Sequence, residues 1–183
     1  AHTFGIGIVN NKGKILANER SMYQSEKGKG IIPIDAAKHH KKIASKILKK
    51  ALKKSRLTID EIDIVAVAIG PGLPPTLWEG INFAKTLGKT IIGVNHCVAH
   101  IEIGKLFGKM KDPLTVYVSG GNTQLTAFSD GKYRVYGETL DIGIGNAIDK
   151  FARGLGLEMP GGPKVEKIAL KGKNYIELPY SVK

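Results

Sequence analysis

The residues most able to do chemistry are two histidines four positions apart, His96 and His100. On a helix this spacing places both rings on one face, where their nitrogens can bind a single metal ion. The alternative is a pair of surface or capping histidines that bind nothing. A zinc peptidase with the HExxH motif is disfavoured, because Cys97 and Val98 follow His96 and neither can act as a general base. Cys97 would point about 100° away from His96 on a helix, so we expect a small buried residue rather than a third ligand.

The second candidate is the glycine-rich segment Ser119-Gly120-Gly121-Asn122-Thr123, which separates two strand-like runs. Two glycines in a turn let backbone N–H groups approach phosphate oxygens with no side chain in the way. Glycine pairs also occur in hairpin turns that bind nothing. The sequence contains neither GxxxxGK[ST] nor GxGxxG, so two large classes of nucleotide-binding fold lose support.

A third candidate is the adjacent pair His39 and His40. Neighbouring residues on a helix point about 100° apart, so the two rings cannot face the same ion or the same cleft. At most one of them belongs to a site, where it could serve as a general base.

An alternating series of strands and helices must position these residues. Pro33 and Asp35 predict a long helix with Asp35 as its N-cap, and Thr58-x-x-Glu61 has the pattern of a capping box. The run DIVAVAI is apolar almost throughout, as in a strand buried on both faces. Together the series favours an α/β fold with a parallel sheet. The expected strands are 4–9, 14–18, 63–69 and 90–94, and the later helices are 75–88 and about 96–107.

After Asp112-Pro113 the pattern restarts, with strands expected at 114–119, 123–128 and 133–138. The pair GIVNNKGKILAN near the start resembles LTAFSDGKYRVY here, each being a strand, a Gly-Lys turn and a strand. Two such halves, 1–113 and 114–183, are typical of the duplicated ribonuclease-H-like architecture of actin, heat-shock ATPases and sugar kinases. We therefore expect a strand and glycine loop before Ala1, and a further C-terminal portion after Lys183, so that the chain is truncated at both ends.

Composition and charge limit the class of protein. With 183 residues, 42% of them hydrophobic, the chain can form one ordinary core or two small ones. A single cysteine excludes an intrachain disulfide, and no apolar run approaches the ~20 residues of a membrane span. We expect a cytoplasmic protein without membrane contact. The net charge of +12 favours a polyanionic partner. Much of the excess lies in Lys38 to Arg56, either as a solvated helix face or as a nucleic-acid contact.

Several long segments together resemble the TsaD family in its archaeal and eukaryotic branch. In chain order these segments are GPGLPPTLWEG, GVNHCVAHIEIGKL, PLTVYVSGGNTQL, GETLDIGIGNAIDKFAR and PGGPKVEKIA. The resemblance implies the actin-like ATPase fold and synthesis of the threonylcarbamoyl adenosine beside the anticodon of tRNAs that read codons beginning with A. It also implies work within the KEOPS complex, with an atypical small kinase, a dimerising subunit and accessory proteins.

The resemblance assigns roles by position. It matches His96 and His100 to the metal-binding pair and Tyr117 to a tyrosine at the same ion, with an Asp ligand expected beyond Lys183. The metal would be iron or zinc, which imidazole and phenolate ligands do not distinguish. The cleft would hold ATP, ADP or threonylcarbamoyl-adenylate, with or without magnesium. The residues matched to this adenylate are Tyr117, Val118, Ser119, Gly120, Gly121, Asp149, Gly162 and Glu166.

These assignments are chemically coherent. Asp149 and Glu166 can accept hydrogen bonds from a ribose or a base, and Gly162 lets backbone approach a ligand closely. From the residues alone, Asp149 can equally pair with Lys150 or Arg153, and Glu166 can lie on an exposed helix. The sequence also departs from the family after the GPG loop, where the helix is several residues short near Leu87-Gly88.

The resemblance implies transfer of a threonylcarbamoyl group from its adenylate to the exocyclic amine of a tRNA adenosine. A metal would polarise the carbonyl, and the YVSGG backbone would position the phosphate. An actin-like sugar kinase or ATPase is the alternative enzyme, although no acidic base for it can be singled out. A basic nucleic-acid-binding scaffold without activity is the alternative outside the enzymes.

Overall fold

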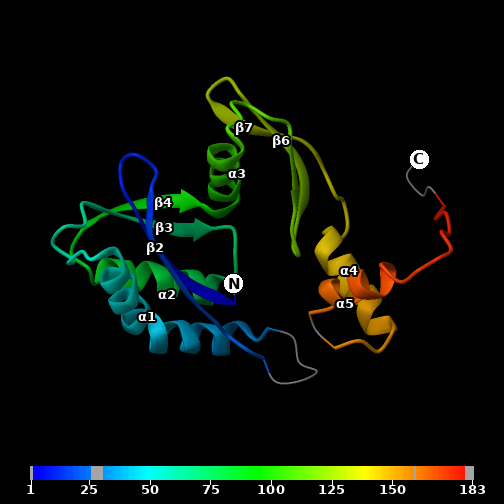
Figure 1. The fold of residues 1–183 in the computed structure, drawn as a ribbon, viewed down its shortest axis with the longest axis horizontal. Helices are drawn as coiled ribbons and strands as arrows, with labels where there is room; N and C mark the ends of the chain where they lie inside the picture. The colour runs from blue at the N-terminus through cyan, green and yellow to red at the C-terminus, as the bar shows by residue number, and fades with distance from the viewer. Residues whose placement is uncertain (1, 26–30, 159, 180–183) are drawn as a thin grey trace. The chain divides into compact units, whose positions relative to one another are not determined.

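Residues 2–25, 31–158 and 160–179 are described by the computed structural model, in which the α/β chain divides into two units, 1–111 and 112–183. The first unit contains β1 (Thr3–Val9), β2 (Ile15–Met22), α1 (Pro33–Ser55), β3 (Ile64–Gly70), α2 (Pro74–Lys85), β4 (Thr90–Asn95) and α3 (His96–Gly108). The second unit contains β5 (Thr115–Val118), β6 (Thr123–Ser129), β7 (Lys132–Glu138), α4 (Ile144–Gly154) and α5 (Gly162–Ala169). In Figure 1 the ribbon is coloured in this order, from blue at the N-terminus to red at the C-terminus.

The hairpin of β1 and β2 is closed by local polar chemistry. The side-chain oxygen of Asn10 accepts the backbone N–H groups of Lys12 and Lys14 at 3.0 and 2.9 Å. Gly13 takes a left-handed φ of 75°, which glycine adopts without steric cost. The sequence therefore predicted this turn correctly.

Helix α1 begins at Pro33, with Ile32 as its N-cap, so the prediction of Asp35 as the N-cap was wrong. Proline is favoured at the first helical position because its missing N–H would have no helical partner there. Asp35 instead lies in the first turn and accepts a hydrogen bond from Lys38 at 3.2 Å. Its negative charge suits the positive end of the helix dipole.

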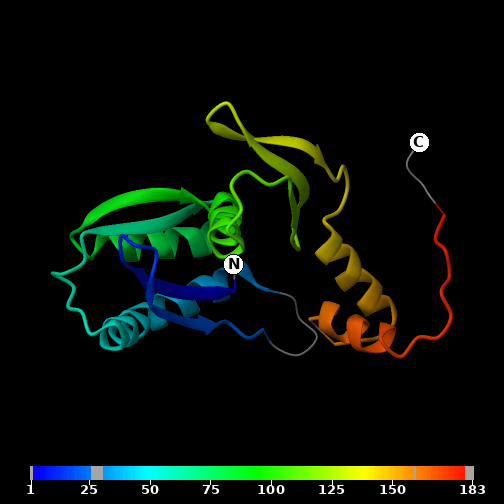
Figure 2. The same ribbon diagram turned by 45° about the horizontal axis from the view of Figure 1, so that its top comes forward.

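The core of the first unit lies between α1 and the hairpin. Ala44 and Ile47 of α1 pack with Phe4, and Ala51 packs with Ile8 and Ala17. The small alanines let the helix approach the sheet closely. Figure 2 shows α1 beside α2, as the contacts between the two helices also indicate.

Strands β3 and β4 pair in parallel, as the alternating pattern predicted, and α2 connects them. The pair β1–β2 and the pair β3–β4 are not hydrogen-bonded to each other. The prediction that β3 is buried on both faces was wrong: Ile64 and Ile69 are 52% and 56% exposed. Helix α2 ends at Lys85, three residues earlier than expected.

The second unit is a three-stranded antiparallel sheet, ordered β5–β6–β7, followed by α4 and α5 packed on each other. The turn between β6 and β7 places Gly131 at a φ of 77°, directly before Lys132. Gly13 and Lys14 take the same arrangement in the first hairpin. None of the helices in the described ranges combines the length and the apolar composition that crossing a bilayer requires.

Candidate functional site

The histidine pair lies at the junction of β4 and α3. Asn95 is the N-cap of α3, and its side-chain oxygen accepts the backbone N–H groups of Cys97 and Val98 at 2.9 and 3.1 Å. This cap makes His96 the first residue of the helix and places His100 one turn later. A short polar residue after an apolar strand is the local reason that the helix starts here.

The rings of His96 and His100 lie close together on one face of α3. The Nε2 atoms of His96 and His100 lie 3.2 Å apart, and the ring planes are nearly perpendicular at 88°. Two imidazole nitrogens that each sit ~2.0–2.1 Å from one tetrahedral ion are about 3.3 Å apart. The observed separation is compatible with such a pair, and it also places the two nitrogens within hydrogen-bond distance of each other.

The environment favours the neutral ligand form of His96. Partial burial of the ring, and then the proximity of His100, lower the pKa of His96 below its ordinary value of 6.5. A neutral imidazole keeps a lone pair for a metal at physiological pH. Within the described ranges no cluster of three or more His, Cys, Asp or Glu side chains could hold an ion.

Tyr117 and Val118 occupy the end of β5 in the second unit. Tyr117 is half-buried and is in register with Gln124 of β6, whereas Val118 is 60% exposed. The strand ends where the glycine-rich loop begins, so these two residues lead directly into the candidate phosphate cradle.

The glycine-rich loop is closed by Ser119. Its backbone N–H and its hydroxyl both donate to the carbonyl oxygen of Asn122, at 2.8 and 2.9 Å. The same hydroxyl accepts the N–H of Asn122 at 3.0 Å. The side chain of Ser119 therefore shapes the turn and is not directed at a ligand.

The first turn of α4 packs directly on this loop. The N–H of Gly145 donates to the carbonyl of Ser119, and that of Asn146 to the carbonyl of Gly120, both at 3.2 Å. The N–H of Ile144 donates to the Thr123 hydroxyl at 2.9 Å. These donors of the helix N-terminus are thus used within the protein and are not offered to an anion.

Two further glycines make this packing possible. A Cβ on Gly143 would come within 2.7 Å of the Asn122 nitrogen, and one on Gly145 within 2.9 Å of the Gly120 Cα. Both are closer than real Cβ contacts. Neither Gly143 nor Gly145 was predicted to be a site residue, although their spacing in the segment IGIGN was the available signal.

Two backbone N–H groups of the glycine-rich loop are available to a ligand. In the part of the chain that the structure describes, the N–H groups of Gly120 and Gly121 have no hydrogen-bond partner. A Cβ on Gly121 would meet nothing within 4 Å, and one on Gly120 would meet only the Asn146 side chain at 3.6 Å. Two adjacent open donors in a turn without side chains are the kind of group that can bind a phosphate, which makes this loop a candidate phosphate cradle.

Asp149 connects α4 to α5. Its Oδ1 atom accepts the N–H groups of Gly161 and Gly162 at 3.0 and 3.3 Å, which fixes the start of α5. Gly161 is buried, and a Cβ there would collide with the Cβ of Ala152. Asp149 therefore holds two helices together, a contact that neither the ligand prediction nor the expected pairing with Lys150 or Arg153 included.

The other predicted adenylate contacts lie on α5. Gly162 is the first residue of the helix and has open space where a Cβ would be. Glu166 is exposed one turn further along. Both are sterically available to a ligand.

The histidines of α1 have different environments. His40 is 3% exposed and packs edge-on against Phe4, with ring centroids 5.6 Å apart, so it belongs to the core and cannot reach a substrate. His39 is half-buried and its Nε2 atom lies 3.1 Å from the Ser21 hydroxyl. Of the two proposed bases, only His39 remains a candidate.

Comparison with known proteins gives a consistent set of relatives. The TsaD family model, described as tRNA N6-adenosine threonylcarbamoyltransferase, matches residues 14–183. Proteins of that name from Thermococcus sibiricus and Thermococcus kodakarensis are 55% and 56% identical to this chain over 187 positions. Each match covers 100% of this chain and 57% of the relative, so the chain spans little more than half of their length.

Two other matches are more distant. A Thermoplasma acidophilum protein named a probable bifunctional tRNA threonylcarbamoyladenosine biosynthesis protein is 51% identical over all of this chain and 35% of its own length. The solved structure of YeaZ from Pseudomonas aeruginosa is 11% identical over 75% of this chain and 62% of its own, with a TM-score of 0.48. That structural similarity is too weak to say more about the fold.

The length of the match can be compared with the expectation that the helix after the GPG loop is several residues short. The relatives match over 187 positions, four more than the 183 residues of this chain. The match therefore includes four positions that this chain lacks, and the early end of α2 is where we expect them.

Proposed function

Because the chain belongs to the TsaD family of tRNA N6-adenosine threonylcarbamoyltransferases, we propose that it carries the ion-binding and phosphate-binding parts of such an enzyme. The reaction is transfer of threonylcarbamoyl from threonylcarbamoyl-adenylate to N6 of the adenosine beside the anticodon, in tRNAs that read codons beginning with A. The observation that carries the proposal is the His96–His100 pair, with Nε2 atoms 3.2 Å apart.

The histidine pair would hold one divalent ion, iron or zinc. When bound, such an ion supplies Lewis-acid polarisation of a carbonyl group. The chain's own contribution is to keep His96 neutral, through its partial burial, and to fix both rings through the Asn95 cap.

The glycine loop would receive the phosphate of the donor. When the amine attacks the carbonyl carbon, the bond to the AMP phosphate breaks and the leaving phosphate gains negative charge. The open N–H groups of Gly120 and Gly121 can stabilise that charge, because they are held in place before the reaction by α4. A nucleotide, ATP or ADP, with or without magnesium, would use the same cradle.

The remaining predicted contacts have supporting roles. Glu166 and Gly162 would contact the ribose or base from α5, and Asp149 would position both by anchoring that helix. His39 is the remaining candidate for a general base. In this proposal residues 1–113 and 114–183 are the two actin-like subdomains of a duplicated ribonuclease-H-like fold.

We further propose a cytoplasmic setting with tRNA and the KEOPS subunits as partners, namely the atypical small kinase, the dimerising subunit and accessory proteins. The direct test is to combine the intact protein, these partners, tRNA and threonylcarbamoyl-adenylate, and to measure modified adenosine by mass spectrometry. Modified tRNA supports the proposal. A phosphorylated small molecule would indicate a sugar kinase or ATPase, and tRNA binding without any product would indicate a scaffold.

A further inference from the structure

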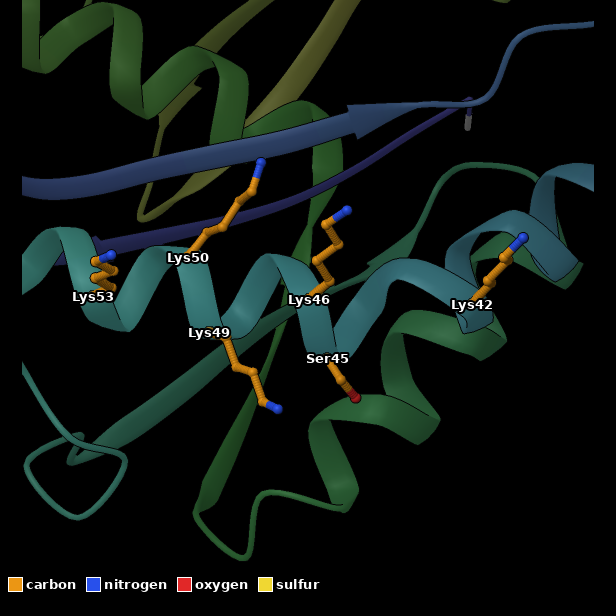
Figure 3. A pocket seen from close by; sticks show the side chains of 6 residues that line it. All are labelled: Lys42, Ser45, Lys46, Lys49, Lys50 and Lys53. Atoms are coloured by element: carbon orange, nitrogen blue, oxygen red, sulfur yellow. The ribbon is translucent and has the colours of Figure 1, made fainter.

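Helix α1 carries a straight row of lysines on the side away from the core. We define the lysine stripe as Lys42, Lys46, Lys49 and Lys53, all of which are exposed. At 100° per residue these four positions fall within about 60° of the helix circumference, and at 1.5 Å per residue they span about 16 Å. Figure 3 shows Lys42 and Lys53 at the two ends of the row, with Ser45 and Lys50 beside it along a shared surface groove.

The stripe is not neutralised by the protein. Two other lysines of α1 do have carboxylate partners: Lys38 pairs with Asp35 at 3.2 Å, and Lys54 pairs with Glu19 at 2.9 Å. Within the described residues, the four stripe lysines make no ion pair. Like charges three or four residues apart on a helix repel each other. The stripe holds three such pairs on one face, so this face of the helix is complementary to a polyanion.

Two other features of α1 indicate which kind of polyanion the lysine stripe would bind. The apolar side of the helix, including Ala44, Ile47 and Ala51, is already buried against the hairpin. No apolar face is left to enter a lipid surface, as an amphipathic membrane helix would require. The stripe also contains lysine and no arginine, so it offers point charges rather than the forked geometry that reads carboxylates or base edges.

We propose that the lysine stripe of α1 binds the sugar-phosphate backbone of the tRNA substrate, without reading its sequence. The proposal rests on the proposed function, which supplies an RNA as the substrate. Lysine ammonium groups about one helical turn apart can each contact a phosphate along one strand. The stripe would orient the tRNA and would take no part in the transfer reaction itself.

The test compares two variants of the intact protein with equal loss of charge. The stripe variant is Lys42→Gln/Lys46→Gln/Lys49→Gln/Lys53→Gln. The control variant is Lys12→Gln/Lys14→Gln/Lys109→Gln/Lys111→Gln, which changes four exposed lysines of the same unit outside α1. Glutamine has nearly the helix propensity of lysine, so α1 should remain folded, and circular dichroism checks this.

Binding of a fluorescently labelled tRNA is measured at several salt concentrations. Each phosphate contact contributes roughly 0.7–0.9 to the slope of log affinity against log salt. The stripe variant should lower that slope by about two to three and weaken binding at least about tenfold at moderate salt. The control should bind within about twofold of the unsubstituted protein. A third variant with arginine at all four stripe positions should retain binding, because the charge is kept.

Equal losses in the stripe and control variants would contradict the proposal, since net charge alone would then explain binding. Competition by polyglutamate as strong as by RNA would also contradict it, and would assign the stripe to an acidic protein. Transfer by the unsubstituted protein is measured in parallel. Stripe-dependent binding with no transfer would overturn only the proposed function, whereas transfer with stripe-independent binding would overturn only this inference.

Discussion

His96 and His100 owe their geometry to one neighbouring side chain. Asn95 accepts two backbone N–H groups and so fixes where α3 begins. If the helix began one residue later, His96 would leave the regular spacing that brings its Nε2 atom to 3.2 Å from that of His100. The geometry of the proposed ion site thus depends on the helix cap as well as on the two histidines.

Replacing His96 tests the ion site directly. His96→Ala in the intact protein should reduce the bound metal from stoichiometric to near zero, because one imidazole of a chelating pair is lost. Elemental analysis of purified protein measures this. His2→Ala is a matched control at a half-buried histidine of the same unit and should retain the metal. Full retention of metal in His96→Ala would contradict the assignment.

The pH dependence of metal retention follows from the lowered pKa of His96. Metal binding needs the neutral ring, and the pKa lies below the ordinary value of 6.5. Occupancy should therefore stay constant from pH 8 to about 6.5 and fall only as the pH drops further, when protons compete for Nε2. Metal content after dialysis at each pH gives the curve, and substantial release above pH 7 would count against it.

The glycines of the phosphate cradle divide into two groups with different roles. Gly121→Ala should leave stability unchanged, since its Cβ would meet nothing within 4 Å, yet weaken nucleotide binding about tenfold by crowding the open N–H groups. Gly145→Ala should cost about 1–3 kcal/mol of stability, because its Cβ would press on the backbone of Gly120. Thermal melts and nucleotide titrations separate the two effects; a strongly destabilised Gly121→Ala would refute the division.

The pair α4 and α5 behaves as one element held by a single carboxylate. Asp149 reaches across twelve residues to the start of α5, where it accepts two N–H groups. A helix of eight residues is too short to be stable alone. The orientation of Gly162 and Glu166 therefore depends on this contact.

Substitutions of Asp149 distinguish anchoring from ligand binding. Asp149→Ala should destabilise the second unit by about 1–3 kcal/mol, because the N–H of buried Gly161 loses its acceptor. Asp149→Asn keeps an acceptor oxygen and should be nearly as stable as the unsubstituted protein. If Asp149→Asn nevertheless lost nucleotide affinity while its melting temperature held, the carboxylate would also contact the ligand.

Two units make up the chain, and each contributes a different kind of chemistry. The first contains the histidine pair, and the second contains the glycine-rich loop that we propose as a phosphate cradle, with the helix that supports it. An ion held by imidazoles suits a carbonyl, whereas a kinase needs magnesium between phosphates and an acidic base. In the proposed function, these two features would serve group transfer with AMP as the leaving group.

Transfer should consequently need no ATP once the adenylate donor has been made. With threonylcarbamoyl-adenylate, tRNA and the partner subunits supplied, removal of ATP by an added ATP-degrading enzyme should leave the rate of tRNA modification unchanged. Mass spectrometry of the tRNA measures the rate. A transfer step that stops when ATP is removed would show that phosphoryl chemistry belongs to the reaction itself.

The local pattern of the sequence determined most of the elements. Alternating apolar residues, the Gly-Lys turns and Pro33 predicted the order and type of the elements up to β7, because these signals act within a few residues of the chain. Some ends differ: β2 runs to Met22 rather than to residue 18, and α2 ends at Lys85 rather than at residue 88. The histidine spacing and the open glycine pair were visible in the same way. Local reasoning failed where two local signals competed, as at the start of α1, where Pro33 begins the helix and Asp35 lies inside the first turn rather than at the N-cap.

Only the tertiary structure decided which of the predicted groups are available. His40 is buried against Phe4, and Asp149 anchors α5. The first N–H donors of α4 bond to the carbonyls of Ser119 and Gly120. Each of these outcomes depends on contacts between residues 12 to 36 positions apart. Residue type and spacing state what a side chain can do, but the packing of distant segments determines whether its atoms remain free to do it.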